Sequence, residues 1–102
     1  MWIANGMALG ILHPKPLTPF HFVIAPRRHV RVFYDLDVQE QGDIWLIIRE
    51  LQKRLADVVE LTGVDIGFED GQSDDDHAHV HVVPRTPGRL VKLPLGVEWV
   101  AW

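Results

Sequence analysis

The chain has 102 residues, of which 47% are hydrophobic and 24% are charged, and its formal net charge is −4. These values are ordinary for one small globular domain, and we expect a single domain over residues 1–102. The negative charge argues against nucleic-acid binding, and the absence of cysteine excludes disulfides and thiolate metal sites. No apolar run approaches the ~20 residues of a membrane span, and the N-terminus lacks the layout of a secretory signal. We therefore expect a soluble cytoplasmic protein with no membrane partner.

Two apolar segments near the N-terminus predict a pair of antiparallel strands. Residues 7–12 are short and apolar, and residues 13–19 contain three prolines, which make a stiff, non-helical connection. Residues 20–25 predict the second strand, which Pro26 ends. Successive side chains point to opposite faces of a strand, so His21 lies opposite the phenylalanine that follows it.

One helix is predicted in the middle of the chain. Asp37 and Glu40 have the spacing of a capping box at its start, and Gly63 fits a C-terminal stop. Between them, apolar residues recur at spacings of three and four, which gives one face to pack on a sheet. These residues are Ile44, Ile47, Ile48, Leu51, Leu55, Val58 and Val59. Trp45 and Leu46 widen this apolar stripe of the helix, and they fit either a broader core or a contact with another subunit.

The second half of the chain predicts further strands. Residues 64–68 alternate as a strand, and residues 69–76 form a polar loop that carries five acidic side chains. A strand with three histidines follows, and residues 95–102 suit a final strand or an extended tail. This order predicts an α+β fold, with an antiparallel β-sheet of about five strands and one main helix packed on it.

The histidine strand is the most informative stretch of the sequence. His77, His79 and His81 alternate with small or β-branched apolar residues. On a strand the three imidazoles would line one face and the apolar residues the other, whereas a helix would scatter them. Pro84 would end this strand because it cannot donate to a ladder.

Three interpretations of these histidines are open. The first is purely structural. The second is a metal site, because His-x-His on a strand is a common ligand spacing and imidazole suits zinc, copper or nickel. Neighbouring histidines would lie about 7 Å apart, so at most two could bind one ion. A third ligand would have to come from a distant histidine or from a carboxylate, namely Glu69, Asp74, Asp75 or Asp76. The third uses one imidazole as a nucleophile and the others to handle phosphate oxygens and protons.

Residues 77–83 resemble the His-φ-His-φ-His-φ-φ motif, in which φ is apolar, of the histidine triad superfamily of nucleotide hydrolases and transferases. Residues 16–30 are similar to the family's Pro-x-x-x-Gly-His-x-φ-φ-x-Pro-basic-basic-His-φ segment, with Phe20 in place of the glycine. Residues 66–71 resemble the strand and turn that lead to the triad. The resemblance covers residues 7–85 in the right order.

The resemblance implies a mechanism and a substrate class. His79 would attack the α-phosphorus of a dinucleoside polyphosphate or a nucleoside phosphoramidate, and water or another acceptor would resolve the nucleotidyl-histidine. His77 and His81 would flank it, and His21 would be a fourth histidine near the phosphate. The family usually needs no metal or other cofactor for this chemistry, and most members are homodimers.

The resemblance also implies residues that bind the substrate. His13 holds the position of an acidic or amide residue that binds the ribose. Gln72 and Ser73 resemble the loop before the triad, and Arg85 is a candidate donor to phosphate oxygens. Glu69 replaces the amide that is usual in the preceding strand.

Two classes of function are open at this point. The first is a nucleotide hydrolase or transferase that uses His79. The second is a non-catalytic protein on the same fold that binds a nucleotide or a divalent metal, because Asp74, Asp75 and Asp76 would repel an anionic substrate unless they point outward or hold a cation.

Overall fold

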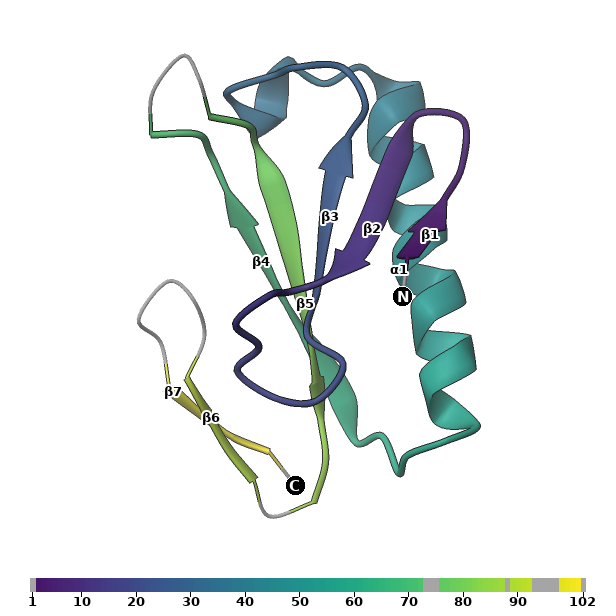
Figure 1. Cartoon of the computed structure of the whole chain (residues 1–102), viewed down its shortest axis with the longest axis vertical. Coiled ribbons are helices and arrows are strands. Elements are labelled where there is room, and N and C mark those ends of the chain that lie inside the picture. The colour runs from purple at the N-terminus through teal and green to yellow at the C-terminus, as the bar shows by residue number, and fades with distance from the viewer. Residues whose placement is uncertain (1, 73–75, 88, 93–97, 102) are drawn as a thin grey trace.

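The computed structural model describes residues 2–72, 76–87, 89–92 and 98–101 (Figure 1). In chain order its elements are β1 (Trp2–Ala4), β2 (Ala8–Leu12), β3 (Phe22–Pro26), the 3-10 helix η1 (Phe33–Asp35), α1 (Val38–Ala56), β4 (Gly63–Glu69), β5 (His79–Arg85), β6 (Arg89–Lys92) and β7 (Glu98–Ala101). Five strands form one antiparallel sheet in the order β1-β2-β3-β5-β4, and β6 pairs with β7 in a second sheet. The predicted α+β fold is confirmed, although the sequence predicts neither β1 nor β6.

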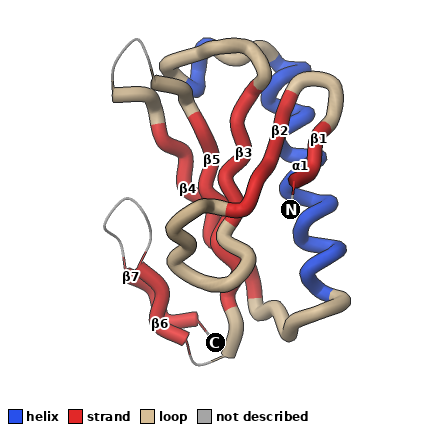
Figure 2. Tube along the Cα trace, in the orientation of Figure 1, coloured by secondary structure: helices blue, strands red, loops and turns tan. Residues whose placement is uncertain are grey.

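Helix α1 packs on one face of the five-stranded sheet. Figures 1 and 2 show it running beside β1, β2 and β3, and it contacts β2 and β3. The core joins buried residues from the predicted stripe of the helix to alternate residues of the strands. They include Ile44, Ile47, Ile48 and Leu51 of α1, Phe22 and Ile24 of β3, and Val80 and Val82 of β5. The intervening residues of β3 and β5 therefore point away from the helix.

The start of α1 is as predicted, and its end is not. Asp37 is the N-cap, and its side chain and that of Glu40 form both bonds of a capping box. The helix ends at Ala56, so the predicted stop at Gly63 is wrong, and Gly63 instead opens β4. The buried stripe ends with the helix, because Val58 is 66% exposed.

Pro26 ends β3 as predicted, whereas Pro84 lies inside β5, so the prediction that Pro84 ends its strand is wrong. Pro26 is the last residue of β3 and pairs with Ala8. Pro84 pairs with Val64 of β4, whereas the pairing between β3 and β5 stops at Val82. Beyond that point β5 has one neighbour, and such an edge position tolerates a residue without an N–H.

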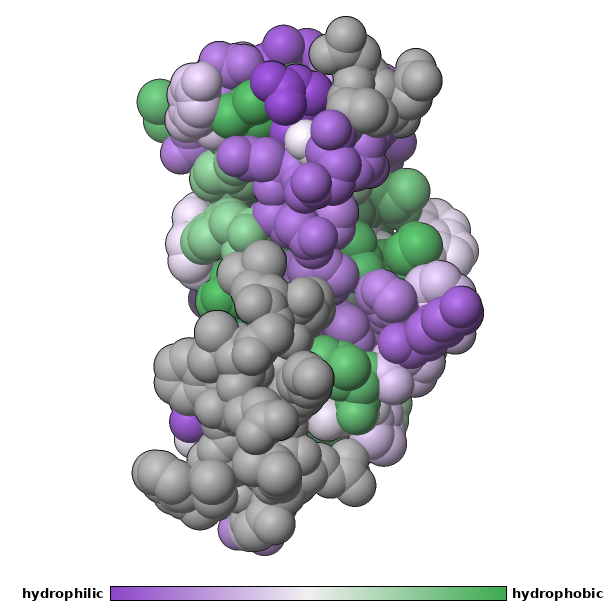
Figure 3. All heavy atoms as spheres, turned by 90° about the vertical axis from the view of Figure 1, so that its left-hand side faces the viewer, coloured by the Kyte–Doolittle hydropathy of each residue, from purple (hydrophilic) through white to green (hydrophobic). Residues whose placement is uncertain are grey.

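Two large apolar side chains of α1 stay exposed. Trp45 is 49% exposed and Leu46 is 56% exposed, so the broader-core interpretation of these residues is wrong. The Trp45 ring lies edge-on to that of Phe68 of β4, with centroids 6.2 Å apart. Viewed from the β4 side, hydrophilic side chains form a band between apolar patches (Figure 3). Within the described part of the chain, no helix is both long and apolar enough to cross a membrane.

The helix–sheet core predicts a clear difference between two neighbouring positions of α1. Leu51 is fully buried in the core, so Leu51→Ala is expected to lower the free energy of unfolding by about 2–5 kcal/mol. Gln52→Ala removes an exposed side chain and is expected to change it by less than about 0.5 kcal/mol. Urea unfolding followed by circular dichroism measures both, and equal losses would contradict the packing of α1 described above.

Candidate functional site

Four histidines from three segments gather on the face of the sheet that points away from α1. His79 and His81 belong to β5, His21 directly precedes β3, and His13 directly follows β2. The ring centroids are 4.9 Å apart for His79 and His81, and 5.2 Å apart for His21 and His81. The rings of His13 and His21 stack at 4.5 Å with 13° between their planes. The structure thus brings together four of the residues that the sequence predicts for the site.

Strand register places a carboxylate among these rings. Glu69 of β4 pairs with His79 of β5, and directly paired residues point to the same face of a sheet. Gly67 pairs with His81 and has no side chain, so Glu69 reaches the His81 ring diagonally. The Oε2 atom of Glu69 lies 2.8 Å from Nε2 of His81 and 3.2 Å from Nε2 of His79.

The loop before β3 holds His21 in place through an unusual backbone conformation. Phe20 has a φ of 68°, in the left-handed region that costs a residue with a Cβ atom on the order of 1–2 kcal/mol. The histidine triad motif has glycine at this position, which suits that backbone. The N–H of His13 donates to the carbonyl oxygen of His21 at 2.7 Å and closes the loop. His21 is 1% exposed as a result.

Hydrogen bonds determine which ring nitrogen carries the proton in each neutral histidine of this cluster. The N–H of Leu17 lies 3.2 Å from Nδ1 of His21, which must therefore accept. Nε2 of His21 then carries the proton and donates to Nδ1 of His81 at 3.0 Å. His81 in turn carries its proton on Nε2 and donates to Oε2 of Glu69 at 2.8 Å. Leu17, His21, His81 and Glu69 form a chain of donors and acceptors, which we call the proton-ordered chain.

The environment of the two inner histidines agrees with this assignment. Burial, with smaller contributions from His13 and His81, lowers the pKa of His21 from 6.5 to about 4. Burial also lowers the pKa of His81, although its hydrogen bond with Glu69 acts in the opposite direction. Both imidazoles are therefore neutral near pH 7, as the directions of their hydrogen bonds require.

His79 is oriented differently. Its Nδ1 lies 2.9 Å from the carbonyl oxygen of His77, which can only accept, so Nδ1 carries a proton. A neutral His79 consequently has its lone pair on Nε2, the nitrogen that faces Glu69. The His79 side chain is 22% exposed, against 5% for that of His81. The His79 ring is therefore more open to solutes than the His81 ring, and the Nε2 lone pair of its neutral form lies beside Glu69.

Two groups of described side chains bring donor atoms close enough to hold a metal ion. They are His13, His21 and His81, and Glu69, His79 and His81. His81 belongs to both, and both of its ring nitrogens are engaged in the proton-ordered chain. Binding a metal through either nitrogen would break one of these bonds.

The sequence of the chain matches the model of a known protein family. A family model described as the HIT domain matches residues 3–88. The chain belongs to the HIT family. The HIT resemblance that the sequence predicts is thereby confirmed, and the match includes all four clustered histidines and Glu69.

Similar HIT proteins have known names and structures. The chain is 27% identical over 95 residues to the bifunctional bis(5'-adenosyl)-triphosphatase/adenylylsulfatase FHIT of Arabidopsis thaliana, covering 90% of this chain and 53% of that protein. It is 29% identical over 82 residues to the asymmetrical bis(5'-nucleosyl)-tetraphosphatase of Schizosaccharomyces pombe, covering 78% and 45%. The solved structure of Plasmodium falciparum diadenosine triphosphate hydrolase matches with a TM-score of 0.72 and 28% identity, covering 82% and 59%. The chain spans about half the length of these two curated relatives.

Several residues lie outside the cluster, although the HIT resemblance predicts them for the site. His77 precedes β5, and its ring packs on that of His29 with centroids 4.1 Å apart. Gln72 is exposed, and its backbone N–H donates to Asp76 at 3.0 Å. Ser73 lies outside the described residues.

Arg85 is at the opposite end of β5 from the clustered histidines. It lies about 20 Å along the strand from His79. Its Nε is 3.3 Å from Oδ2 of Asp65, a contact without good hydrogen-bond geometry. Burial raises the pKa of Asp65 and the charge of Arg85 opposes that rise, so the guanidinium partly compensates the charge of a buried carboxylate.

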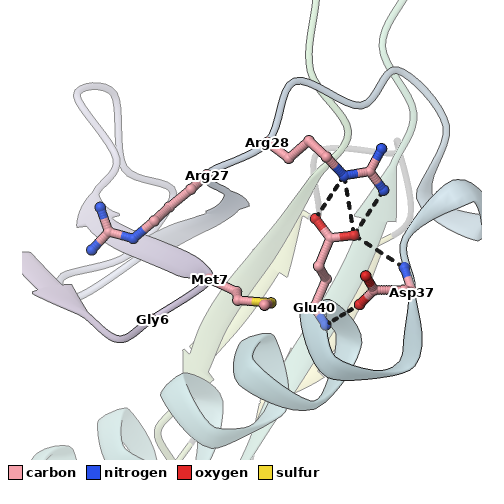
Figure 4. Close-up of a pocket in the computed structure, with 6 residues that line it drawn as sticks. All are labelled: Gly6, Met7, Arg27, Arg28, Asp37 and Glu40. Atoms are coloured by element: carbon pink, nitrogen blue, oxygen red, sulfur yellow. Dashed lines mark hydrogen bonds and ion pairs between the residues drawn. The ribbon is translucent and has the colours of Figure 1, made fainter.

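Arg28, in the basic segment Arg27–Arg28 after β3, has a structural role. Arg28 bonds to Glu40 through Nε and Nη2, the shortest contact being 2.7 Å, beside a pocket at the start of α1 (Figure 4). The hydrogen bond from Arg28 keeps the pKa of the Glu40 carboxyl below its usual value, and the capping bond with Asp37 acts in the same direction. Arg28 thus ties the loop after β3 to the helix cap.

Glu69 is the member of the cluster that the sequence does not place among the catalytic or substrate-binding residues. In the sequence it is a substitution for an amide and one of several possible metal ligands, because an isolated carboxylate beside a polar loop gives no sign of its hydrogen-bond partners. The signal that could have found it is pairing: a strand that ends at Glu69 and pairs with the histidine strand places this side chain opposite His79.

The buried, neutral His21 predicts loss of stability in acid. The unfolded chain binds a proton on this residue near pH 6.5, whereas the folded chain does so near pH 4. The free energy of unfolding should therefore fall as the pH drops through this window, by about 3 kcal/mol in total. Urea unfolding between pH 4 and pH 7 measures this slope. We expect His21→Asn to flatten it and the exposed-histidine control His29→Asn to keep it; an unchanged slope in His21→Asn would contradict the assignment.

Proposed function

We propose that the protein is a nucleotide hydrolase or transferase that cleaves at the α-phosphate of a dinucleoside polyphosphate or a nucleoside phosphoramidate. The observation that carries this proposal is the orientation of His79. Its Nδ1 proton is held by the carbonyl oxygen of His77, which leaves the Nε2 lone pair on an accessible ring. The similarity to diadenosine triphosphate and dinucleoside tetraphosphate hydrolases supports the substrate class.

The reaction would proceed in two displacements. Nε2 of His79 attacks the α-phosphorus, and the bond from that phosphorus to the leaving oxygen or nitrogen breaks. A nucleotidyl-histidine forms, and the leaving group departs with the bonding electrons and takes a proton from solvent where it needs one. Water or another acceptor then displaces His79, gives up its proton to solvent and releases the nucleotide. The hydrogen bond from Nδ1 to the His77 carbonyl stabilises the positive charge that develops on the ring during the first step.

The remaining cluster residues would hold the substrate beside His79. His81 and His21 stay neutral, and His81 fixes the Glu69 side chain by donating to it. His13 stacks on His21 at the rim of the cluster, where a ribose could meet its ring. Gln72 and Ser73, which resemble the family's loop before the triad in sequence, are also proposed to contact the substrate. No metal is required in this scheme.

Mass spectrometry of the intact protein tests the nucleophile. Brief incubation with a panel of adenylyl and guanylyl conjugates is expected to add one nucleotidyl mass, labile in acid, to the wild-type protein. His79→Ala should show no adduct and should lose on the order of a thousandfold or more in kcat/KM. His29→Ala, which removes an exposed histidine outside the cluster, should keep both adduct and turnover, and a chelator should have no effect.

Two other outcomes would decide against this proposal. An adduct on His79→Ala would assign the nucleophile elsewhere. Absence of both adduct and turnover with every conjugate would favour a non-catalytic binding protein on the same fold. The Glu69 carboxylate beside Nε2 of His79 is the observation that would support that alternative.

Two copies of the chain are expected to pair through the exposed apolar residues of α1 and β4. Trp45, Leu46 and Phe68 are 49%, 56% and 40% exposed, and the rings of Trp45 and Phe68 touch. Sedimentation velocity should give a dimer for the wild-type protein and a monomer for Leu46→Asp. Lys53→Asp, a change of charge on an exposed polar position of α1, should leave the dimer intact. A monomeric wild-type protein would contradict this assembly.

A further inference from the structure

Three donor atoms converge where Glu69 meets the histidine strand. Oε2 of Glu69 lies 2.8 Å from Nε2 of His81 and 3.2 Å from Nε2 of His79. The donor atoms of all three residues lie within 4.8 Å of one another. The four ligands of a tetrahedral zinc ion, with bonds of about 2.0–2.2 Å, lie about 3.3 Å apart. The three atoms therefore stand close to the separations that one zinc ion requires.

The ring of His79 has the orientation of a metal ligand. Its Nδ1 donates to the carbonyl oxygen of His77 at 2.9 Å, and the lone pair of its neutral form is on Nε2, beside Glu69. Histidines that bind metals almost always donate their other N–H to a carbonyl oxygen or a carboxylate, which fixes the tautomer and strengthens the ligand. The His79 ring therefore needs no change of tautomer to bind a cation through Nε2.

Glu69 supplies a negative charge that the other group of donor atoms lacks. That group, formed by His13, His21 and His81, consists of imidazoles alone. Nδ1 of His13 accepts from the N–H of Lys15 at 2.9 Å, and both ring nitrogens of His21 belong to the proton-ordered chain. A carboxylate attracts a divalent cation, most strongly where water screens the charge poorly. Charge therefore favours the group that contains Glu69.

We propose that Glu69, His79 and His81 form a binding site for a divalent transition-metal ion such as zinc. The ion bonds to Oε2 of Glu69 and to Nε2 of each histidine, and water takes its remaining position. Two imidazoles and one carboxylate suit zinc and its first-row neighbours, whereas magnesium and calcium prefer oxygen ligands. The site itself does not depend on the proposed function. Its effect on turnover does, because zinc on Nε2 of His79 takes the lone pair that would attack phosphorus.

Metal binding at this site reverses part of the proton-ordered chain. In the metal-free protein His81 carries its proton on Nε2, the atom that the metal takes. A neutral, metal-bound His81 carries its proton on Nδ1 and donates to Nε2 of His21, whose own proton moves to Nδ1. These two rings hold two protons before and after binding. The cost is the hydrogen bond that the N–H of Leu17 donates to Nδ1 of His21.

Calorimetry with zinc chloride tests the site in the intact chain. The wild-type protein, freed of metal with EDTA and dialysed, is expected to bind one zinc ion per chain at this site. Glu69→Gln keeps an acceptor for His81 and removes the charge, so the affinity should fall by about tenfold or more, and His79→Ala should lose at least as much. Asp70→Asn removes a neighbouring carboxylate and should keep the wild-type affinity. An equal loss in Asp70→Asn would overturn the site in favour of a general charge effect.

Chemical modification tests whether the metal occupies the ring nitrogen of His79. Diethyl pyrocarbonate acylates accessible, neutral imidazoles, and mass spectrometry of peptides follows each histidine separately. Zinc is expected to slow the modification of His79 by about tenfold or more in the wild-type protein and to have little effect in Glu69→Gln. His29, an exposed histidine outside the cluster, should react at the same rate with and without zinc. Equal protection of His29 would overturn the site in favour of non-specific binding.

The tautomer of His21 reports whether His81 is a ligand. Nitrogen-15 NMR identifies the unprotonated ring nitrogen of each neutral histidine. In His21 this nitrogen is expected to be Nδ1 in the metal-free protein and Nε2 in the zinc-loaded protein. Zinc binding that leaves the tautomer of His21 unchanged would overturn the site of three residues.

The failure of this inference and the failure of the proposed function are distinguishable. Turnover that requires His79, in a protein that binds no zinc or binds it as well as Glu69→Gln does, overturns the metal site and keeps the proposed function. Zinc binding with the expected losses, in a protein that turns over no conjugate even when metal-free, keeps the site and overturns the function. Where both hold, saturating zinc should abolish turnover and EDTA should restore it. Turnover that persists at saturating zinc would overturn the inhibition.

Discussion

The hydrogen bond between His21 and His81 is the contact on which the geometry of the site depends. It joins a loop residue to the middle of a strand, and it has a direction, because the N–H of Leu17 makes Nδ1 of His21 an acceptor. That direction passes through His81 to Glu69, so a backbone amide in the proline-rich loop determines where the Glu69 carboxyl group points. A chain of neutral groups can do this inside a protein, whereas charged imidazoles at these buried positions would require counter-charges.

The order of the strands brings the residues of the proton-ordered chain within hydrogen-bonding distance of one another. Strand β5 lies between β3 and β4, so its outward-facing histidines can meet the residue before β3 on one side and the last residue of β4 on the other. The opposite face of the same strands contributes Val80 and Val82 to the core under α1. Packing and chemistry thus use alternate residues of one strand, and each can change without displacing the other. The strained backbone at Phe20 is explained by its position, because this conformation directs His21 into the cluster.

Local patterns in the sequence were enough to predict the helix start, the alternation of the strands and the histidine face of β5. They failed where the answer depended on which strands are neighbours. Pro84 remains within β5 because β3 no longer pairs with the strand at that point, and nothing near Pro84 in the sequence reveals this. The pairing of Glu69 with His79 was missed for the same reason, since the two residues are ten positions apart and strand register brings them together. The site residue Arg85 followed from its place after the triad, yet its side chain lies beside Asp65.

The exchange of an amide for a carboxyl group at Glu69 separates two properties that the family motif usually combines. An amide oxygen and a carboxyl oxygen accept equally well from Nε2 of His81, so the proton-ordered chain and the fold are compatible with either. They differ in charge and in donors, because an amide always carries N–H donors and a carboxyl group carries a donor only while it is protonated. The substitution therefore keeps the contact with His81 that orients this side chain and changes the group that lies 3.2 Å from Nε2 of His79.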